Sequence, residues 1–245
     1  MWLTSLQAGV IISSGDRGMW FGLFDPLYFI MLMPALLLGL YAQWRVRSTF
    51  AQYSRVRATS GLEAGRLARR LLDGAGLSSV RIEQIQGVLT DHYDPRTRTL
   101  RLSRPESRSL AHLGVAAHEV GHAIQHARAY APLSLRTAIV PVVNFGSQLA
   151  FPLFFLGILF QNPLLVNVGI IAYSLAVLFT LVTLPVEFDA SRRAIRLLQD
   201  GGYIASGKEL AAVRRVLGAA ALTYVAAAAT AILTLLYLLL VSRRR

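Results

Sequence analysis

The sequence contains no cysteine, and this absence excludes disulfides, thiolate metal ligands and a cysteine nucleophile. Any metal site must therefore use histidine and carboxylate side chains. Lysine is almost absent as well, because Lys208 is the only one among 25 lysines and arginines. With 13 acidic residues, the net charge is +12 at pH 7. No nucleic-acid motif accompanies this charge, and we therefore expect no nucleic acid among the partners.

Charge is also missing from long apolar stretches of the chain. The sequence is 54% hydrophobic and its mean hydropathy is +0.49, which is too apolar for a protein surrounded by water. A helix needs about 20 apolar residues to cross a bilayer. We therefore predict a mainly α-helical integral membrane protein with four transmembrane helices. The first lies at 24–44, the second and third form a tight hairpin at 137–184, and the fourth lies in 218–245 before a basic C-terminus.

Two polar regions separate the predicted helices, at 45–136 and 185–217, and a short extension of residues 1–23 precedes them. The extension lacks the basic start and the long apolar core of a cleaved signal peptide. Arginines crowd both polar regions, so the positive-inside rule places them in the cytoplasm of a bacterium, with the chain in its inner (cytoplasmic) membrane. Both termini are then outside the cell, and the three arginines at 243–245 are an exception to the rule. Membrane lipid is an expected partner.

The region 45–136 begins with the pattern of a short amphipathic helix. Ser60 and Glu63 have the spacing of a capping box, and apolar residues follow at helical spacing. Gly74 and Gly76 are suited to end this helix. We therefore expect one short helix before the next polar turn.

The same region then shows strand patterns and a second helix. Alternating residues predict strands at Val80–Glu83 and Thr99–Leu102, paired as a small antiparallel sheet with Leu100 and Leu102 on its buried face. From about residue 106 to residue 129 the apolar spacing becomes helical. We expect these elements to form a cytoplasmic α+β region with a small sheet, and the histidines and glutamate of its second helix make it the candidate catalytic region.

The second helix of this region carries His118, Glu119 and His122. Two histidines four residues apart lie about 6 Å apart along a helix axis, so their imidazoles can converge on one zinc ion. Zinc lowers the pKa of its bound water to about 7, and a neighbouring carboxylate can take the remaining proton and pass it to the leaving amine. The motif predicts a zinc-dependent peptidase with Glu119 as the general base.

A catalytic zinc takes three protein ligands and keeps one position open. His126 lies two turns beyond His118, about 12 Å along the axis, so we exclude it as a ligand and expect it at the surface or behind the ligands. Glu187 follows the third predicted span, and the hairpin returns the chain to the side of the motif just before it. Zinc ligation by Glu187 is the favoured interpretation. The alternative is an ion pair with Arg192 or Arg193.

Other polar residues have open roles. His92 either assists near the metal or hydrogen-bonds within its own turn, and His92, Tyr203 and Arg192 are candidates to stabilise the oxyanion. Three residues of the second span form a polar stripe that we expect to pack between helices, with a substrate path as the alternative. They are Asn144, Ser147 and Gln148.

Several stretches resemble the YugP-type family of bacterial neutral zinc metallopeptidases, in the family's order. The resemblance implies a zincin-like, more narrowly gluzincin-like, membrane peptidase with zinc ligands at His118, His122 and Glu187. Related CAAX-prenyl and heat-shock membrane proteases carry an acidic residue four positions after the third ligand. Ser191 stands there and is a candidate to hydrogen-bond a ligand imidazole, with Asp189 as the alternative. The stretches are FDPLY, YAQ, LTDHYDP, LRLS, AAHEVGHAIQHA and LPVEFDASRRA.

In such enzymes an edge strand near the metal aligns the substrate backbone by strand addition. Arg98–Ser103 is the candidate strand, and we expect polypeptide substrates from unfolded or membrane-associated proteins. The alternative function is a non-catalytic membrane adaptor whose zinc site is structural or silent and whose region 45–136 binds partner proteins. A structural zinc usually has four protein ligands and has no use for Glu119, so the enzyme is favoured.

Overall fold

The computed structural model of the protein describes residues 26–243. The predicted extension of residues 1–23, the first residues of the first predicted span, and Arg244 and Arg245 lie outside the described residues. The described chain is mainly helical with one small sheet, as predicted. Its elements are α1 (Pro26–Tyr53), α2 (Ala64–Gly74), β1 (Arg81–Gln84), β2 (His92–Asp94), β3 (Thr99–Leu102), α3 (Leu110–Ala127), α4 (Ala131–Leu159), α5 (Pro163–Asp200) and α6 (Gly207–Arg243).

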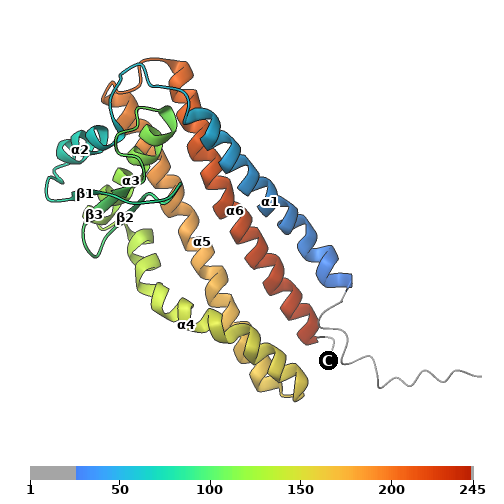
Figure 1. Ribbon diagram of the computed structural model, residues 1–245. Coiled ribbons are helices and arrows are strands. Elements are labelled where there is room, and N and C mark those ends of the chain that lie inside the picture. Colours follow the sequence, from blue (N-terminus) through green and yellow to red (C-terminus); the bar gives the residue numbers. More distant parts are fainter. Residues whose placement is uncertain (1–25, 244–245) are drawn as a thin grey trace, which may run out of the picture.

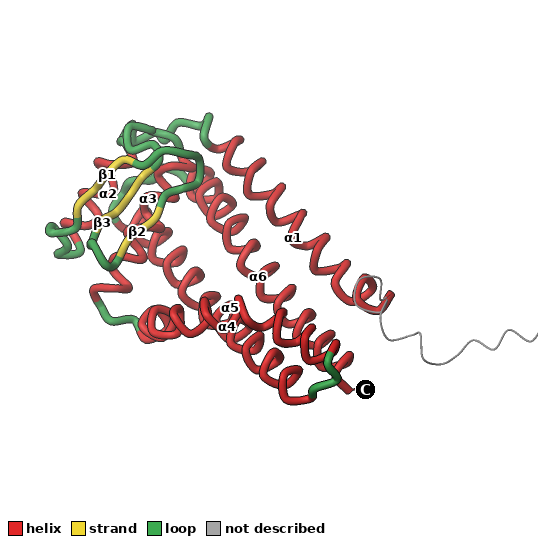
Figure 2. The backbone as a smooth tube through the Cα atoms, turned by 60° about the horizontal axis from the view of Figure 1, so that its bottom comes forward, coloured by secondary structure: helices red, strands yellow, loops and turns green. Residues whose placement is uncertain are grey.

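Four helices are long and apolar enough to cross a membrane, namely α1, α4, α5 and α6. The prediction of four membrane helices is therefore confirmed at the level of length and composition. In Figure 1, α1, α5 and α6 run side by side, and α4 bends before it joins the first turns of α5. Proline removes a backbone hydrogen bond inside a helix, and α4 contains Pro141 and Pro152. Figure 2 shows the sheet gathered with α2 and α3 at one end of the long helices.

The long helices extend well beyond the predicted apolar spans. Helix α5 continues past residue 184 to Asp200, and α6 already begins at Gly207. The region 185–217 is therefore largely the two helix ends and a short turn between them. This continuity matters for the site, because Glu187 lies on a long helix whose position is fixed by packing.

The predicted tight hairpin of α4 and α5 is confirmed. Asn162 caps α5 by accepting hydrogen bonds from the backbone N–H groups of Leu164 and Leu165, at 3.0 and 3.3 Å. The helices approach closely at two glycines. A Cβ on Gly157 would lie 2.5 Å from the Val166 nitrogen, and one on Gly169 would lie 2.8 Å from the Ala150 oxygen. Small residues allow two helix backbones to approach closely in a bilayer, where the hydrophobic effect does not drive helices together.

The α+β end has its own apolar core. Leu100 and Leu102 of β3 are buried, as predicted, and pack with the apolar face of α2, with α3 and with the ends of α5 and α6. The amphipathic face of α2 contributes Leu67, Leu71 and Leu72. Burial of these side chains ties the sheet to the long helices, so the two parts of the molecule share one hydrophobic cluster.

The pairing within the sheet differs from the prediction. The strand order is β1-β3-β2, with β1 parallel and β2 antiparallel to β3. The prediction that the segments 80–83 and 99–102 form an antiparallel pair is therefore wrong. The reason is local: β2 and β3 are joined by a short turn, so β2 takes the hairpin position, and the loop after β1 returns the chain for a parallel pair. As a result β3 is the central strand, and Arg98–Ser103 is not an edge.

The predicted capping box is also wrong. Helix α2 has Glu63 at its N-cap, and the Glu63 side chain accepts no hydrogen bond from the backbone N–H groups of the helix. The first helical N–H groups instead donate to distant backbone carbonyls, Ala64 to Ser107 and Gly65 to Pro105, both at 2.8 Å. These long-range bonds satisfy the free N–H groups that a capping side chain would have served.

Candidate active site

Helix α3 carries the predicted motif, and its position against α5 depends on a glycine. Ser109 caps α3 by accepting a hydrogen bond from the His112 N–H. About three turns later, a Cβ on Gly121 would lie 2.7 Å from the Ala190 oxygen of α5. Only glycine permits this approach without a shift. Because Gly121 lies inside the motif, the close contact brings α5 directly beside His118 and His122.

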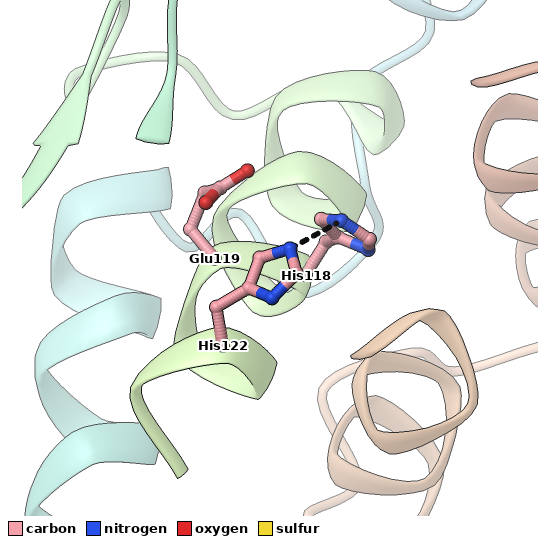
Figure 3. A group of neighbouring side chains, drawn as sticks. All are labelled: His118, Glu119 and His122. Carbon is pink, nitrogen blue, oxygen red and sulfur yellow. Dashed lines mark hydrogen bonds between the residues drawn. The ribbon is translucent and has the colours of Figure 1, made fainter. Parts of the chain in front are cut away.

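Three potential ligand atoms meet between α3 and α5. The Nε2 atoms of His118 and His122 are 3.1 Å apart, and Figure 3 shows the two rings turned toward each other. The Glu187 Oε2 atom lies 3.3 Å from the His118 Nε2 atom and 3.5 Å from the His122 Nε2 atom. Ligand atoms around tetrahedral zinc, at about 2.0–2.1 Å from the ion, are separated by about 3.3 Å. The three spacings fit that geometry.

The burial of the Glu187 carboxylate is a second indication of a metal site. Its Oε2 atom is buried and forms no hydrogen bond with the described residues, although the two imidazole Nε2 atoms lie 3.3 and 3.5 Å from it. A buried polar atom without such a partner is costly and calls for an explanation. A cation between this oxygen and the two imidazoles would satisfy it, so the donor set fits a zinc ion.

Glu119 lies beside this group in a different role. Its carboxylate is within 4.8 Å of the imidazole nitrogens, but its Oε2 atom accepts a hydrogen bond from the backbone N–H of Tyr93 in β2, at 2.9 Å. The side chain is buried, and burial raises the pKa of Glu119, although the neighbouring histidines act in the opposite direction. A buried, oriented carboxylate with a raised pKa is suited to accept a proton.

Each imidazole is oriented through its other nitrogen. The Ser191 hydroxyl lies 3.1 Å from the His118 Nδ1 atom, as suggested by the sequence comparison with related families. The His122 Nδ1 atom lies 3.0 Å from the Gln125 Oε1 atom, and because an amide oxygen only accepts, Nδ1 of His122 carries the hydrogen. The Nε2 atom of His122 is then free to bind a metal.

Gln125 is a residue that the sequence analysis missed. It is fully buried, and its amide nitrogen donates to the Val186 oxygen at 2.8 Å and to the Asp189 Oδ2 atom at 2.9 Å. Asp189 thus acts on His122 through Gln125, and it also accepts a hydrogen bond from Arg193. Gln125 lies three residues after His122 on the same helix face, which is the signal that was available in the sequence.

The other carboxylate oxygen of Glu187, Oε1, pairs with an arginine from α4. The Arg136 Nη1 atom lies 3.1 Å from the Glu187 Oε1 atom. The anticipated alternative partners were Arg192 and Arg193, but Arg193 pairs with Asp189. The sequence shows Arg136 only as one of the arginines of the polar region 45–136. Its contact links the hairpin to the candidate ligand and holds the carboxylate in place.

A cavity of about 280 Å³ adjoins the His118 imidazole and reaches α1 and α6. His118, Glu119 and Ser191 line one side, and Tyr224 of α6 lines the other. Tyr224 was missed because it lies in an apolar span and no sequence motif connects it to the histidines. Its phenol can donate a hydrogen bond, and it interacts with the Glu187 carboxylate.

Two further histidines lie outside the candidate ligand group. The His126 Nδ1 atom is 2.9 Å from the Tyr93 hydroxyl, so its exclusion as a ligand agrees with the structure. The His92 Nδ1 atom is 2.9 Å from the Thr90 oxygen, which supports local bonding over a role at the metal. Tyr93 therefore contacts both the base, through its backbone, and His126, through its hydroxyl.

The remaining sequence candidates are placed elsewhere. Tyr203 packs on the core of the α+β end, and Arg192 lines a hollow between α5 and α6 that shares Ser191 with the active-site cavity. The polar stripe of α4 is exposed, and the Ser147 hydroxyl donates to the Asn144 carbonyl of its own helix. The stripe does not pack between the described helices, so the prediction of interhelical packing is wrong. Its three residues are Asn144, Ser147 and Gln148.

Comparisons with known proteins agree with the motif. Residues 28–243 match the model of a protein family described as "Putative neutral zinc metallopeptidase". The chain is 48% identical over 212 residues to "Putative membrane protease YugP" of Bacillus subtilis (strain 168), covering 86% of this chain and 94% of that protein. No solved structure matches significantly. The family predicted from the sequence motifs is thus confirmed, and the chain belongs to this family of neutral zinc metallopeptidases.

Proposed function

We propose that this protein is a membrane-embedded zinc endopeptidase that hydrolyses peptide bonds in unfolded or membrane-associated polypeptides. The observation that carries the proposal is the meeting of three ligand atoms at tetrahedral spacing, from His118, His122 and Glu187, beside the buried carboxylate of Glu119. Zinc held there would supply a Lewis acid that polarises a carbonyl group and acidifies water.

Glu119 is the proposed general base. The Tyr93 N–H holds one of its oxygens, and burial increases its affinity for a proton. It removes a proton from the attacking water, whose oxygen adds to the carbonyl carbon of the peptide bond. The C–N bond then breaks, and the same carboxyl group returns the proton to the leaving amine.

Tyr224 is the proposed oxyanion donor in place of His92, Tyr203 and Arg192. Its side chain lines the cavity that also contains His118 and Glu119. Negative charge develops on the carbonyl oxygen during attack, and a positioned O–H group stabilises that charge most strongly in a site that excludes water.

The substrate backbone is proposed to add to the free edge of β2. Strand β3 has a neighbour on each side, so it cannot receive a further strand. Strand β2 has β3 on one side only, and the Tyr93 N–H points away from β3 to Glu119. Because that N–H is bonded to Glu119, an extended polypeptide on this edge would bond to other backbone groups of β2 and would pass beside the base, which predicts broad side-chain preference.

The site is proposed to face the cytoplasm of the bacterial inner membrane. The support is the crowding of arginines in 45–136 and in the ends of α5 and α6. Reporter fusions at a residue within 75–79, between α2 and β1, should report a cytoplasmic location. A periplasmic signal from these fusions would reverse the topology.

The alternative, a non-catalytic adaptor, requires that the metal site be structural. A structural zinc is normally enclosed by four protein ligands, whereas the described site brings three ligand atoms together next to a cavity. The direct test is to purify the protein in detergent, measure bound zinc, and compare it with Glu119→Gln on an unstructured polypeptide. We expect the variant to retain zinc and lose hydrolysis. Equal hydrolysis by both proteins would defeat the proposed mechanism.

A further inference from the structure

An apolar groove of about 530 Å³ lies between α1 and α6. Its α1 wall extends from Phe29 to Gln43, about 20 Å along the helix axis. Its α6 wall extends from Thr223 to Thr230. None of the described residues that line it is charged, and both helices are long and apolar enough to cross a membrane. The groove therefore suits an apolar occupant within the bilayer.

This groove is continuous with the cavity of the candidate active site. Gln43 and Thr223 line both of them. Beyond Gln43, the same face of α1 supplies Val46 and Phe50 to the active-site cavity, at helical spacing. On α6, the residue that follows Thr223 is Tyr224, the proposed oxyanion donor. The two hollows are thus successive parts of one path between α1 and α6.

The junction of the groove and the cavity is polar, which distinguishes a polypeptide from a lipid acyl chain. A helical segment must unwind before one of its peptide bonds can enter the cavity, and the released N–H and C=O groups then need partners. The exposed Gln43 amide lies at this point and can donate and accept, and the Thr223 hydroxyl, which donates to the Ala220 carbonyl, can accept from an N–H group. An acyl chain has no such groups to satisfy, and it presents no amide bond to Glu119.

The groove walls also permit close approach of another backbone. Gly39 of α1 has nothing within 4 Å of the position of an added Cβ, and Ala226 and Ala227 face the groove from α6. Small residues such as these allow helices to pack closely in a bilayer without a large apolar driving force.

We propose that the preferred substrates are membrane-inserted polypeptides whose apolar segment occupies this groove. The segment unwinds at Gln43 and Thr223, and the peptide bond just beyond it is hydrolysed in the cavity. This inference rests on the proposed peptidase function and assigns its substrate class. The chemistry is unchanged, since water supplies the oxygen to the carbonyl carbon and the proton to the amine.

The first test compares two peptides with one cleavable extended sequence, in nanodiscs that contain the zinc-loaded enzyme. One peptide carries an apolar segment of about 20 residues, and the other does not. The measured quantity is the ratio of kcat/KM for the anchored peptide to that for the free peptide. A ratio well above one is expected for the wild type, and no cleavage of either peptide would reject the peptidase function itself.

Groove-filling variants separate binding in the groove from simple concentration in the membrane. Gly39→Phe fills the groove from α1, and Ala227→Leu fills it from α6. Each should lower the kcat/KM ratio by about tenfold, as expected when a bound apolar segment loses its contacts. Gly218→Phe is the matched control, because Gly218 also has open space around its Cβ position but lies outside the groove. A ratio unchanged by both filling variants would overturn the proposal and leave the peptidase function standing.

Cross-linking gives a measurement that does not depend on turnover. A benzophenone amino acid is placed at Met33, which lines the groove, or at Leu37, which is exposed on the same helix but does not line it. The background is Glu119→Gln. We expect the anchored peptide to cross-link at Met33 and much less at Leu37. Cross-links from Met33 to phospholipid alone, or equal peptide yields at both positions, would reject the groove as the substrate site.

Discussion

The α+β end and the long helices are held together by different interactions. At the candidate zinc site, buried polar groups are joined to specific partners, from Ser191 and Gln125 behind the imidazoles to Arg136 behind Glu187. Along the long helices, large apolar side chains such as Leu36 and Phe145 point outward. The difference teaches that geometry at the site depends on single polar contacts, whereas the helices depend on close packing at small residues.

The largest effect is expected at Glu187, because this residue lies on a long helix and also belongs to the candidate zinc site. Glu187→Ala removes one of three candidate ligand atoms from α5, and we expect zinc affinity to fall by more than about 100-fold with loss of hydrolysis. Metal content after dialysis against a weak chelator measures this. Glu63→Ala is the control, because Glu63 pairs only with arginines far from the site. Full zinc occupancy in Glu187→Ala would remove this residue from the ligand set.

Tyr224→Phe tests whether a residue of an apolar span acts in the chemistry. If the phenol stabilises the oxyanion, its loss should lower kcat by about 100-fold with little change in KM and with zinc retained. Tyr237→Phe is the matched change on the same helix, in the apolar cluster of the long helices. Equal kcat values for the two variants would assign Tyr224 to packing alone.

Gly121→Ala tests the packing that positions the site. The added methyl group would lie 2.7 Å from the Ala190 oxygen, so α3 and α5 must separate, at a cost of about 1–3 kcal/mol. We expect a lower unfolding temperature together with weaker zinc binding. Gly218→Ala on α6 meets nothing within 4 Å and should be neutral or stabilising, by up to about 1 kcal/mol. Unaltered zinc binding in Gly121→Ala would show that the site tolerates movement of α5.

The membrane helices and the histidine motif were predictable because their signals are local. An apolar run of about 20 residues has few alternatives to a membrane helix, and an i, i+4 pair of histidines on a helix fixes its own geometry. Glu187 was accessible for a related reason, since the hairpin of α4 and α5 returns the chain to its starting side. In each case the neighbouring sequence determines the position of the residue.

The sheet and the outer contacts of the site were not predictable in the same way. The parallel pair of β1 and β3 depends on the path of the intervening loop, which no periodicity records. The cap of α2 failed because backbone carbonyls of Ser107 and Pro105, far along the chain, replaced the local side chain. Arg136 and Tyr224 reach the site from two separate membrane helices. Residues that act across elements leave no local pattern, and this explains why they were missed.

The smallest effect is expected from a contact that only orients a ligand. The Ser191 hydroxyl lies 3.1 Å from the His118 Nδ1 atom, and loss of such an outer contact typically weakens metal binding by about 10–100-fold. Ser191→Ala should weaken zinc binding by an amount near the lower end of this range. The reason is that a neutral hydroxyl is a weaker partner than the carboxylate found at this position in related families. Ser174→Ala is the control on the same helix, because that hydroxyl bonds only to the Ile170 carbonyl of α5. Weaker zinc binding in Ser191→Ala alone, with kcat preserved at saturating zinc, would separate orientation of the ligand from the chemical step. Identical zinc affinity in both variants would leave the orientation of His118 to helix packing, and the polar network would then be less important than the close contact at Gly121.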